Sequence, residues 1–184
     1  MSNVLESLPS LETEHLVLRK IDKKDTNDIY SYCSNSAVSR YVTWDTHTCK
    51  EETESFIDCV LDGYKHDHKA LWGMELKATG KIVGTIDFVS IDEQHMNAEI
   101  GYVLSEVWWG RGLTTEASKR LIQFGFTELK LERIQARCMA ENIGSQKVME
   151  KAGMSFEGTS RKGFFSNGTF HDIKNYSILR EEFK

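Results

Sequence analysis

The stretch that decides the fold reads AEIGYVLSEVWWGRGLTTEA, from Ala98 to Ala117. Its apolar first half favours a β-strand, which we expect to span Met96 to Leu104. Two glycines follow, and apolar residues then recur at spacings of 4, 4 and 3 from Leu113 to Phe124. That spacing predicts a helix that runs to about Leu129. The chain therefore passes from a strand through a glycine-rich loop directly into a helix.

A helix start beside glycines is suited to bind an anion. The first turn leaves backbone N–H groups unpaired and carries positive dipole density, and glycine lets a ligand approach the backbone closely. We therefore expect a phosphate or pyrophosphate on the N–H groups of residues 110–115, with Arg111 adding a charge-assisted bond. The alternative is a plain strand–turn–helix corner in which the glycines serve packing. The loop lacks the G-K-[ST] of a nucleotide P-loop, and Thr115 leaves G-x-G-x-x-G incomplete, so ATP and dinucleotides are disfavoured.

A second helix start follows the next predicted strand, Ile134–Met139. Here the chain reads NIGSQKVMEKAGM, from Asn142 to Met154. Asn142 and Ser145 are both residue types that cap helix N-termini, and we expect a short helix from Ser145 to Ala152 that stops at the following glycine. The two segments would bring two helix starts to adjacent strand ends, where open α/β sheets bind ligands.

The other elements are predicted from their periodicity. Thr48 and Glu51 fit a capping box in front of the helix Lys50–Lys65. The remaining expected elements are a helix at 25–33, strands at 16–21, 71–77, 81–91, 154–161 and 171–179, and hairpin turns at 78–80 and 166–168. This order predicts a mixed sheet with helices packed against it, in an α/β or α+β domain.

Composition is that of an ordinary globular domain and argues against several functions. The 184 residues are 40% hydrophobic and 28% charged with a net charge of −5, and we expect one domain over 1–184. The acidic balance argues against direct nucleic-acid binding. No apolar run is long enough to span a membrane, and the N-terminus lacks a secretory signal pattern. The four cysteines form no C-x-x-C pair and are expected as free thiols in the cytoplasm.

The two loop–helix segments resemble the acyl-CoA-binding motifs of the GNAT N-acetyltransferase superfamily. The first is similar to its pyrophosphate loop, [QR]-x-x-G-x-[GA]. The second is similar to the N-x-x-S…K-x-G-[FM] segment of the branch that includes ribosomal-protein N-terminal acetyltransferases. The likeness covers essentially the whole chain, since it extends to TEHLVLR at 13–19 and to Gly163, Asn167-Gly168, Asp172, Tyr176 and ILREEF at 178–183.

The resemblance implies a fold, an activity and a cofactor. The fold would be a GNAT-like mixed, mostly antiparallel central sheet of about seven strands flanked by helices. The activity would be transfer of an acetyl group from acetyl-CoA to a primary amine by direct attack of the neutral amine. The alternative is a non-catalytic acyl-CoA-binding module that senses the cofactor or regulates a partner.

The resemblance also assigns residues to the cofactor. Backbone groups of Val103 and Leu104 would pair with the pantetheine amides, and Asn142 would bind the arm from the other side. The expected contacts to the rest of acetyl-CoA come from the loop and the two helix starts, namely Trp109, Gly110, Arg111, Gly112, Leu113, Thr114, Thr115, Ser145 and Lys147. Trp109 stands where the family usually has Gln or Arg, and Thr114 stands where it has Gly or Ala. The backbone N–H contribution needs no particular side chain.

Two residues are the expected catalytic groups by this resemblance. Glu99, on the central strand, is the candidate base for the ammonium proton, directly or through water. Its alternative role is that of an ion-paired strand residue. Ser145 is the candidate that protonates the leaving thiolate, and its alternative role is to cap the helix.

The acceptor side is predicted less sharply. Trp44, Trp72, Asp87 and His171 are the expected substrate-binding residues, although the core or the cleft wall is the more usual place for the two tryptophans and for Tyr41. The acceptor would be a protein N-terminus or a small-molecule amine, and a homodimer is a further expectation because dimers are common in the family. His66-Asp67-His68 looks like a metal site, but we expect a solvated helix end and no metal.

The charge divides unevenly along the chain. Residues 111–151 carry eight basic and five acidic groups, a net +3 that leaves −8 for the rest. The positive excess falls in the segment expected to bind the polyanionic cofactor, and the acidity elsewhere suits a cationic amine.

Overall fold

The protein is built around one mixed sheet. The computed structural model describes residues 5, 7–66, 69–166 and 168–183. In that part of the chain, eight strands follow the order β1-β2-β3-β4-β5-β6-β8-β7. They are β1 (Leu11–Glu12), β2 (Leu16–Arg19), β3 (Leu71–Leu76), β4 (Lys81–Asp92), β5 (Asn97–Leu104), β6 (Arg133–Met139), β7 (Ser155–Ser166) and β8 (Thr169–Leu179). In the described part of the chain, neighbouring strands pair antiparallel, except that β5 and β6 run parallel.

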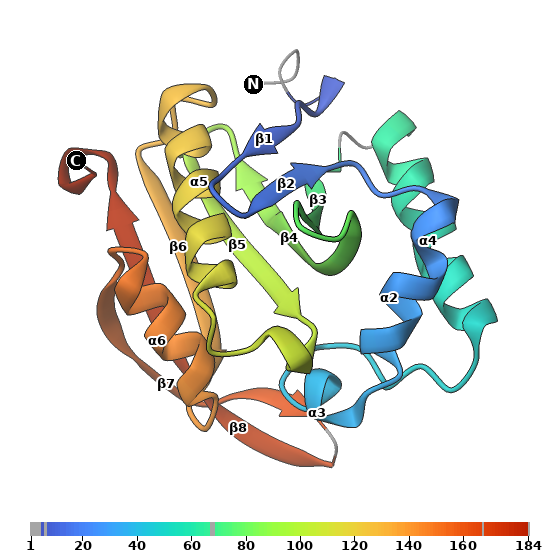
Figure 1. The fold of residues 1–184 in the computed structure, drawn as a ribbon. Helices are drawn as coiled ribbons and strands as arrows, with labels where there is room; N and C mark the ends of the chain where they lie inside the picture. The colour runs from blue at the N-terminus through green and yellow to red at the C-terminus, as the bar shows by residue number, and fades with distance from the viewer. Residues whose placement is uncertain (1–4, 6, 67–68, 167, 184) are drawn as a thin grey trace.

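Helices cover the two faces of this sheet (Figure 1). They are α2 (Thr26–Cys33), α3 (Ser36–Ser39), α4 (Lys50–His66), α5 (Leu113–Thr127) and α6 (Ile143–Lys151), with short 3₁₀ turns η1 (Lys23–Asp25), η2 (Glu106–Trp108) and η3 (Arg180–Glu182). Phe124 of α5 packs edge-on against Trp72 of β3, with ring centroids 5.7 Å apart. Tyr32 of α2 contacts Thr85 of β4. Because neighbouring strand residues point to opposite faces, α5 and α2 lie on opposite sides of the sheet.

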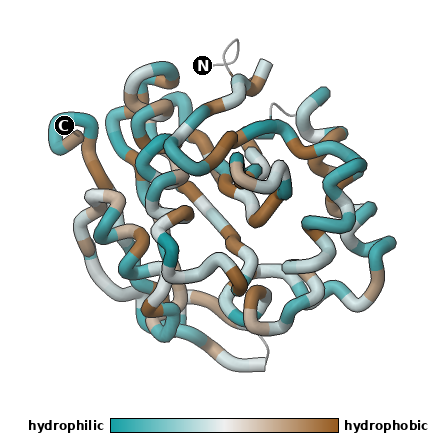
Figure 2. The backbone as a smooth tube through the Cα atoms, in the orientation of Figure 1, coloured by the Kyte–Doolittle hydropathy of each residue, from teal (hydrophilic) through white to brown (hydrophobic). Residues whose placement is uncertain are grey.

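The core lies between the sheet and the helices. Apolar residues gather along the central strands, whereas the outer turns of α4 are mostly hydrophilic (Figure 2). Trp72, Phe124, Met74 and Ile86 are at most 1% exposed. No helix in the described part of the chain is long and apolar enough to cross a membrane.

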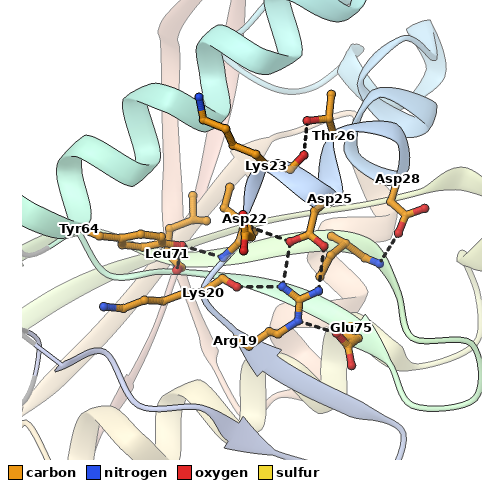
Figure 3. A network of polar contacts seen from close by, with 12 residues as sticks. Arg19, Lys20, Asp22, Lys23, Asp25, Thr26, Asp28, Tyr64, Leu71 and Glu75 are labelled. Carbon is orange, nitrogen blue, oxygen red and sulfur yellow. Dashed lines mark hydrogen bonds and ion pairs between the residues drawn. The ribbon is translucent and has the colours of Figure 1, made fainter.

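An ion network joins the first strands to the helices beside them (Figure 3). The Arg19 guanidinium donates two hydrogen bonds of 2.8 Å to Asp25 and one of 2.5 Å from Nε to Glu75. Tyr64 of α4 accepts a bond from the backbone N–H of Ile21 and donates one of 2.8 Å to the carbonyl of Leu71. These bonds fix α4 and the turn before α2 against β2 and β3.

Most predicted elements are present, and the expected mixed, mostly antiparallel sheet of about seven strands is confirmed, with the two-residue β1 as an eighth described strand. Two local details differ from the prediction. The capping box is wrong by one residue, since Glu52 rather than Glu51 accepts the backbone N–H of Thr48 at 2.6 Å. Strand β7 continues to Ser166, five residues beyond the expected end at 161.

Two other predictions fall partly outside the described residues. The hairpin turn at 166–168 contains Asn167, which the structure does not describe. The same holds for Asp67 and His68 of the metal-like triplet, while His66 lies 3.5 Å from Asp62 one turn earlier on α4.

Candidate active site

The sheet opens between β5 and β6. These parallel strands pair only at Asn97–Arg133, Ala98–Ile134 and Glu99–Gln135. Beyond that point β5 continues to residue 104 and β6 to residue 139 without pairing to each other. The unpaired strand edges leave a gap that an extended ligand fits as an added strand, because the backbone groups along it seek hydrogen bonds.

Glu99 lies at the last paired position before the gap. Its carboxylate is held by Arg137 Nε at 2.9 Å and by Gln135 Nε2 at 3.3 Å, and its side chain is 15% exposed. The ion-paired strand role foreseen for Glu99 is therefore present. It is compatible with catalysis because each carboxylate oxygen has a second lone pair.

The Glu99 cluster continues along the sheet. Arg133 donates to Gln135 Oε1 at 3.3 Å and, with bonds of 2.7 and 2.6 Å, to both carboxylate oxygens of Glu157. These bonds from Arg133 lower the pKa of Glu157 to about 2. A cavity of about 190 Å³ lies beside these residues and includes Glu99 in its lining. This polar face therefore provides an open approach to Glu99.

The backbone of β5 determines which groups face the gap. The N–H of Ser105 donates to the carbonyl of Val83 at 2.8 Å, so the backbone groups of Ser105 point toward β4. Backbone groups alternate along an antiparallel strand, so Val103 is also directed at β4, and its oxygen lies against Gly84. Tyr102 and Leu104 direct their backbone groups toward the gap. The expected pairing of Val103 with pantetheine is therefore wrong, because β4 already engages its backbone.

Trp109 holds the carbonyl that faces this gap. Its indole N–H donates a 2.7 Å bond to the carbonyl of Leu104, while its ring remains 48% exposed. Beside it, the Arg111 guanidinium stacks on Trp108 at 4.6 Å from the ring centroid. The Trp109 side chain thus turns back onto β5 rather than toward the helix start.

The glycine loop has the backbone geometry of an anion site. Gly110 and Gly112 adopt φ of +74° and +81°, a region that other residues rarely adopt, and Gly112 is the N-cap of α5. Helix geometry leaves the N–H groups of Leu113, Thr114 and Thr115 without intrahelical partners. The two glycines with positive φ let the loop after β5 present these N–H groups together to solvent.

The second helix start lies next to the first strand of the gap. The Asn142 side chain accepts the backbone N–H of Ser145 at 3.0 Å, so Asn142 is the N-cap and Ser145 lies inside the first turn. Ser145 therefore has no capping role, and its hydroxyl lies 2.8 Å from the hydroxyl of Tyr102 on β5. Lys147 is exposed one turn from the cap.

Asp87 lies on the same face of the sheet as Glu99. It pairs with Gly101 of β5, and a side chain at that glycine would come within 3.1 Å of the Asp87 carboxylate. Burial raises the pKa of Asp87 to about 6, Lys69 opposes the rise, and the Glu99 carboxylate adds to it. Because residue 101 is a glycine, no side chain at that position covers the partly buried Asp87 carboxylate.

The other acceptor candidates are placed differently. Trp72 is 0% exposed, and its indole N–H donates to the carbonyl of Pro9. The prediction that it binds substrate is wrong, because it is a core residue under α5. Trp44 is partly buried against the core and stacks on His47, and His171 bonds to Ser166 within the β7–β8 hairpin. Neither side chain joins the Glu99 cluster.

Comparison with known proteins identifies the family. Residues 15–155 match the family model described as the acetyltransferase (GNAT) domain. The chain belongs to the GNAT acetyltransferase family. It is 33% identical over 172 residues to the N-acetyltransferase YoaA of Bacillus subtilis, a match that covers 94% of this chain and 97% of that one. The Escherichia coli spermidine N(1)-acetyltransferase is 27% identical over 168 residues, covering 90% and 87%.

Solved structures agree with this assignment. A GNAT-family acetyltransferase from Bacillus anthracis superposes with a TM-score of 0.84 at 32% identity and covers 94% of this chain and 99% of its own. The protein is thus an N-acetyltransferase of the GNAT family that uses acetyl-CoA as acetyl donor. The opened β5–β6 pair and the glycine loop at the start of α5 fit such a donor, because they offer strand-edge hydrogen bonds next to an anion site.

Two residues that contact the candidate groups are missing from the sequence-based set. Arg137 contacts Glu99, and Tyr102 contacts Ser145. Alternate residues of a strand point to the same face of the sheet, so the sequence could have placed Arg137 on the same face as Gln135. Nothing in the sequence indicates the contact between Tyr102 and Ser145, which lie 43 positions apart.

Proposed function

We propose that this GNAT enzyme acetylates a primary amine on a cationic acceptor, with Glu99 as the base and Ser145 as the acid. The observation that carries the proposal is their position on two sides of the gap. Glu99 ends the paired part of β5, and Ser145 lies in the first turn of the helix that follows β6. A thioester inserted between the strands would then have a carboxylate and a hydroxyl at its two ends.

The donor would bind along the gap and the two helix starts. Its pyrophosphate fits the N–H groups of residues 110–115 with Arg111, because these groups concentrate positive potential. The pantetheine amides fit the backbone of Leu104 and Tyr102, and the free side-chain N–H₂ of Asn142 is available from the opposite side. The proposed phosphate-side contacts also include Gly110, Gly112, Leu113, Thr114, Thr115 and Lys147. The expected contact from Trp109 is not part of this proposal, because its indole is bonded to the Leu104 carbonyl and competes with the donor there.

The proton balance assigns separate tasks to the two catalytic residues. The acceptor enters as an ammonium ion and must lose a proton before its nitrogen can attack, and Glu99 takes this proton directly or through water. When the tetrahedral intermediate collapses, the C–S bond breaks and its electron pair goes to sulfur. Ser145 gives its proton to sulfur and regains one that the nitrogen releases. In total the ammonium group loses two protons, one to solvent and one to the departing thiol.

The acceptor proposal is supported by the acidic face beside the gap. The side chains of Asp87 and Glu99 lie on the same face of the sheet, and Gly101 places no side chain over Asp87. A second positive charge on the acceptor would bind to Asp87 while its reactive amine lies near Glu99. Spermidine, the substrate named for the E. coli relative, has this pattern of charges. Trp44 and His171 are proposed at the rim of this cleft, and a protein N-terminus is the other acceptor class.

An amine panel tests the proposal. The protein is incubated with acetyl-CoA and spermidine, with peptides bearing free N-termini, or with a monoamine of spermidine's length, and release of the CoA thiol is followed. We expect spermidine to give a kcat/KM at least tenfold above that of the monoamine, the equivalent of 1.4 kcal/mol for one charge-assisted contact. Equal values would refute the role of the second charge. CoA binding with no turnover of any amine would favour the non-catalytic sensor.

A cytoplasmic location and a homodimer remain predictions. The location agrees with the free state of Cys33, Cys49, Cys59 and Cys138. Fractionation of cells that express the protein, and light scattering of the purified chain, are the respective measurements.

A further inference from the structure

Tyr102 is the only phenol within hydrogen-bond distance of Ser145 in the described part of the chain. The phenol oxygen lies 2.8 Å from Ser145 Oγ and 3.2 Å from the Ser145 backbone carbonyl. It reaches from β5 to α6, the elements on the two sides of the gap. The Cys138 thiol also contacts Ser145, but a thiol is a weak hydrogen-bond partner, so Tyr102 is the stronger influence on the rotation of the Ser145 hydroxyl.

The phenol has one proton and two acceptors within reach. When it donates to the carbonyl, Ser145 must direct its own proton at the phenol oxygen. When it donates to Ser145 Oγ, the O–H of Ser145 no longer bonds to the phenol, and its hydrogen can point into the gap. The two arrangements differ only in the rotation of two hydroxyl groups, because both oxygen–oxygen distances are already within hydrogen-bond range.

Tyr102 stays protonated in either arrangement. Burial raises the pKa of Tyr102 far above its usual range, and the contact with Ser145 offsets only part of this rise. A neutral phenol donates a hydrogen bond but does not deliver its proton at neutral pH. Burial also raises the pKa of the neighbouring Cys138 thiol, to about 11, so this thiol is protonated as well. The two side chains that contact Ser145, Tyr102 and Cys138, are therefore both neutral at neutral pH.

We propose that Tyr102 is a positioning residue that directs the Ser145 proton toward the leaving sulfur. The inference rests on the proposed role of Ser145 as the acid. During collapse of the intermediate, Tyr102 donates to Ser145 Oγ, and Ser145 donates to sulfur. As the serine proton moves to sulfur, the phenol hydrogen bond stabilises the negative charge that develops on Oγ until the proton from the nitrogen arrives.

A double-mutant cycle tests this inference with Tyr102→Phe, Ser145→Ala and the combined variant. The amine is whichever of the panel the wild type acetylates fastest. We expect Tyr102→Phe to lower kcat about tenfold, as for loss of one hydrogen bond to a developing charge, and to change the KM for acetyl-CoA less than twofold. Ser145→Ala should lower kcat further, and the combined variant should equal Ser145→Ala, because without the hydroxyl Tyr102 has nothing to direct.

A matched control separates this role from packing. Tyr30 of α2 is half-buried, and its hydroxyl donates to the carbonyl of Thr48 at 3.5 Å. Tyr30→Phe removes a bonded tyrosine hydroxyl away from the gap and should leave kcat within twofold. Melting temperatures and CoA affinity by calorimetry confirm that each variant is folded. If Tyr102→Phe does not fold, Tyr102→Leu, which also lacks a hydrogen-bond donor, replaces it in the cycle.

The outcomes distinguish the inference from the proposed function. A drop in kcat for Ser145→Ala with no drop for Tyr102→Phe would overturn the inference and leave the acid role of Ser145 intact. Multiplicative effects in the combined variant would have the same meaning, since the two residues would then act independently. An unchanged kcat for Ser145→Ala would refute the acid role and the inference together.

Discussion

Replacing Trp109 by Phe should tighten CoA binding. The indole N–H donates a 2.7 Å bond to the Leu104 carbonyl, which faces the gap and is the proposed acceptor for a pantetheine amide. The donor must displace the indole to use this oxygen. A net hydrogen bond is worth about 0.5–1.5 kcal/mol, so its removal should lower the Kd for CoA about two- to tenfold. We expect the lower part of this range, because a ring that is 48% exposed recovers a water partner when displaced.

The Kd for CoA is measured by calorimetry, with Trp108→Phe as the control. Trp108 stacks under Arg111 at 4.6 Å, and a phenyl ring preserves that stacking, so the control should bind CoA as the wild type does. Fluorescence provides a second measurement. CoA should change the emission of wild type and of Trp108→Phe, and it should change that of Trp109→Phe much less. Weaker or unchanged CoA binding by Trp109→Phe would refute the displacement, and would mean that the indole stays on Leu104 or itself contacts the donor.

Three further predictions concern the carboxylates. Asp25→Asn should destabilise the fold by about 3 kcal/mol, or about 6–12 °C in melting temperature, because Arg19 loses a buried charged partner and keeps at most one of its two hydrogen bonds there. Burial raises the pKa of Asp25, but hydrogen bonds from Arg19 and the Asp22 N–H outweigh this effect, so the pKa in the folded protein is lowered. The free energy of unfolding of the wild type should therefore fall as the pH drops below the usual pKa of 3.8, and that of the variant should fall less. Because the pKa of Asp87 is about 6, the KM for spermidine should rise as pH falls through 6, and Asp87→Asn should remove that dependence. Glu99→Gln should lower kcat by a factor of about 10²–10⁴ with an unchanged Kd for CoA, and an unchanged kcat would exclude it as the base.

Helices and strands of this fold were predictable from the sequence where a local pattern of apolar, glycine or capping residues determines them. The helix at α4 follows from apolar spacing over 17 residues, and the two helix starts follow from glycine and capping residues. The ends were less predictable. Glu51 and Glu52 are both plausible capping partners for residues before α4, and only the observed start of the helix distinguishes them. Strand β7 is mostly exposed, so no alternation of apolar residues marks where it ends.

The glycine loop of the candidate site was predictable, but the strand register and the side-chain contacts around it were not. Gly110 and Gly112 indicate the anion loop because few other residues adopt their φ values. Trp72 looked like a cleft residue since an aromatic ring suits both a cleft and a core, and only burial separates the two. Val103 was assigned to the gap by resemblance, whereas the register of β5 against β4 turns its backbone away.

The charge distribution requires the same correction. The net charge of +3 on residues 111–151 predicts that this segment forms the donor-binding side. Two of its basic groups, Arg133 and Arg137, alternate on β6 with Ile134, which packs toward α5, so they lie on the opposite face. There they bind Glu157 and Glu99. These cations hold the carboxylates of the acceptor side in place, and the phosphates must instead depend on Arg111, the lysines of α6 and the backbone N–H groups of α5. High salt should therefore weaken CoA binding less than a count of eight basic residues implies, because N–H groups that are part of a helix start release no counterions.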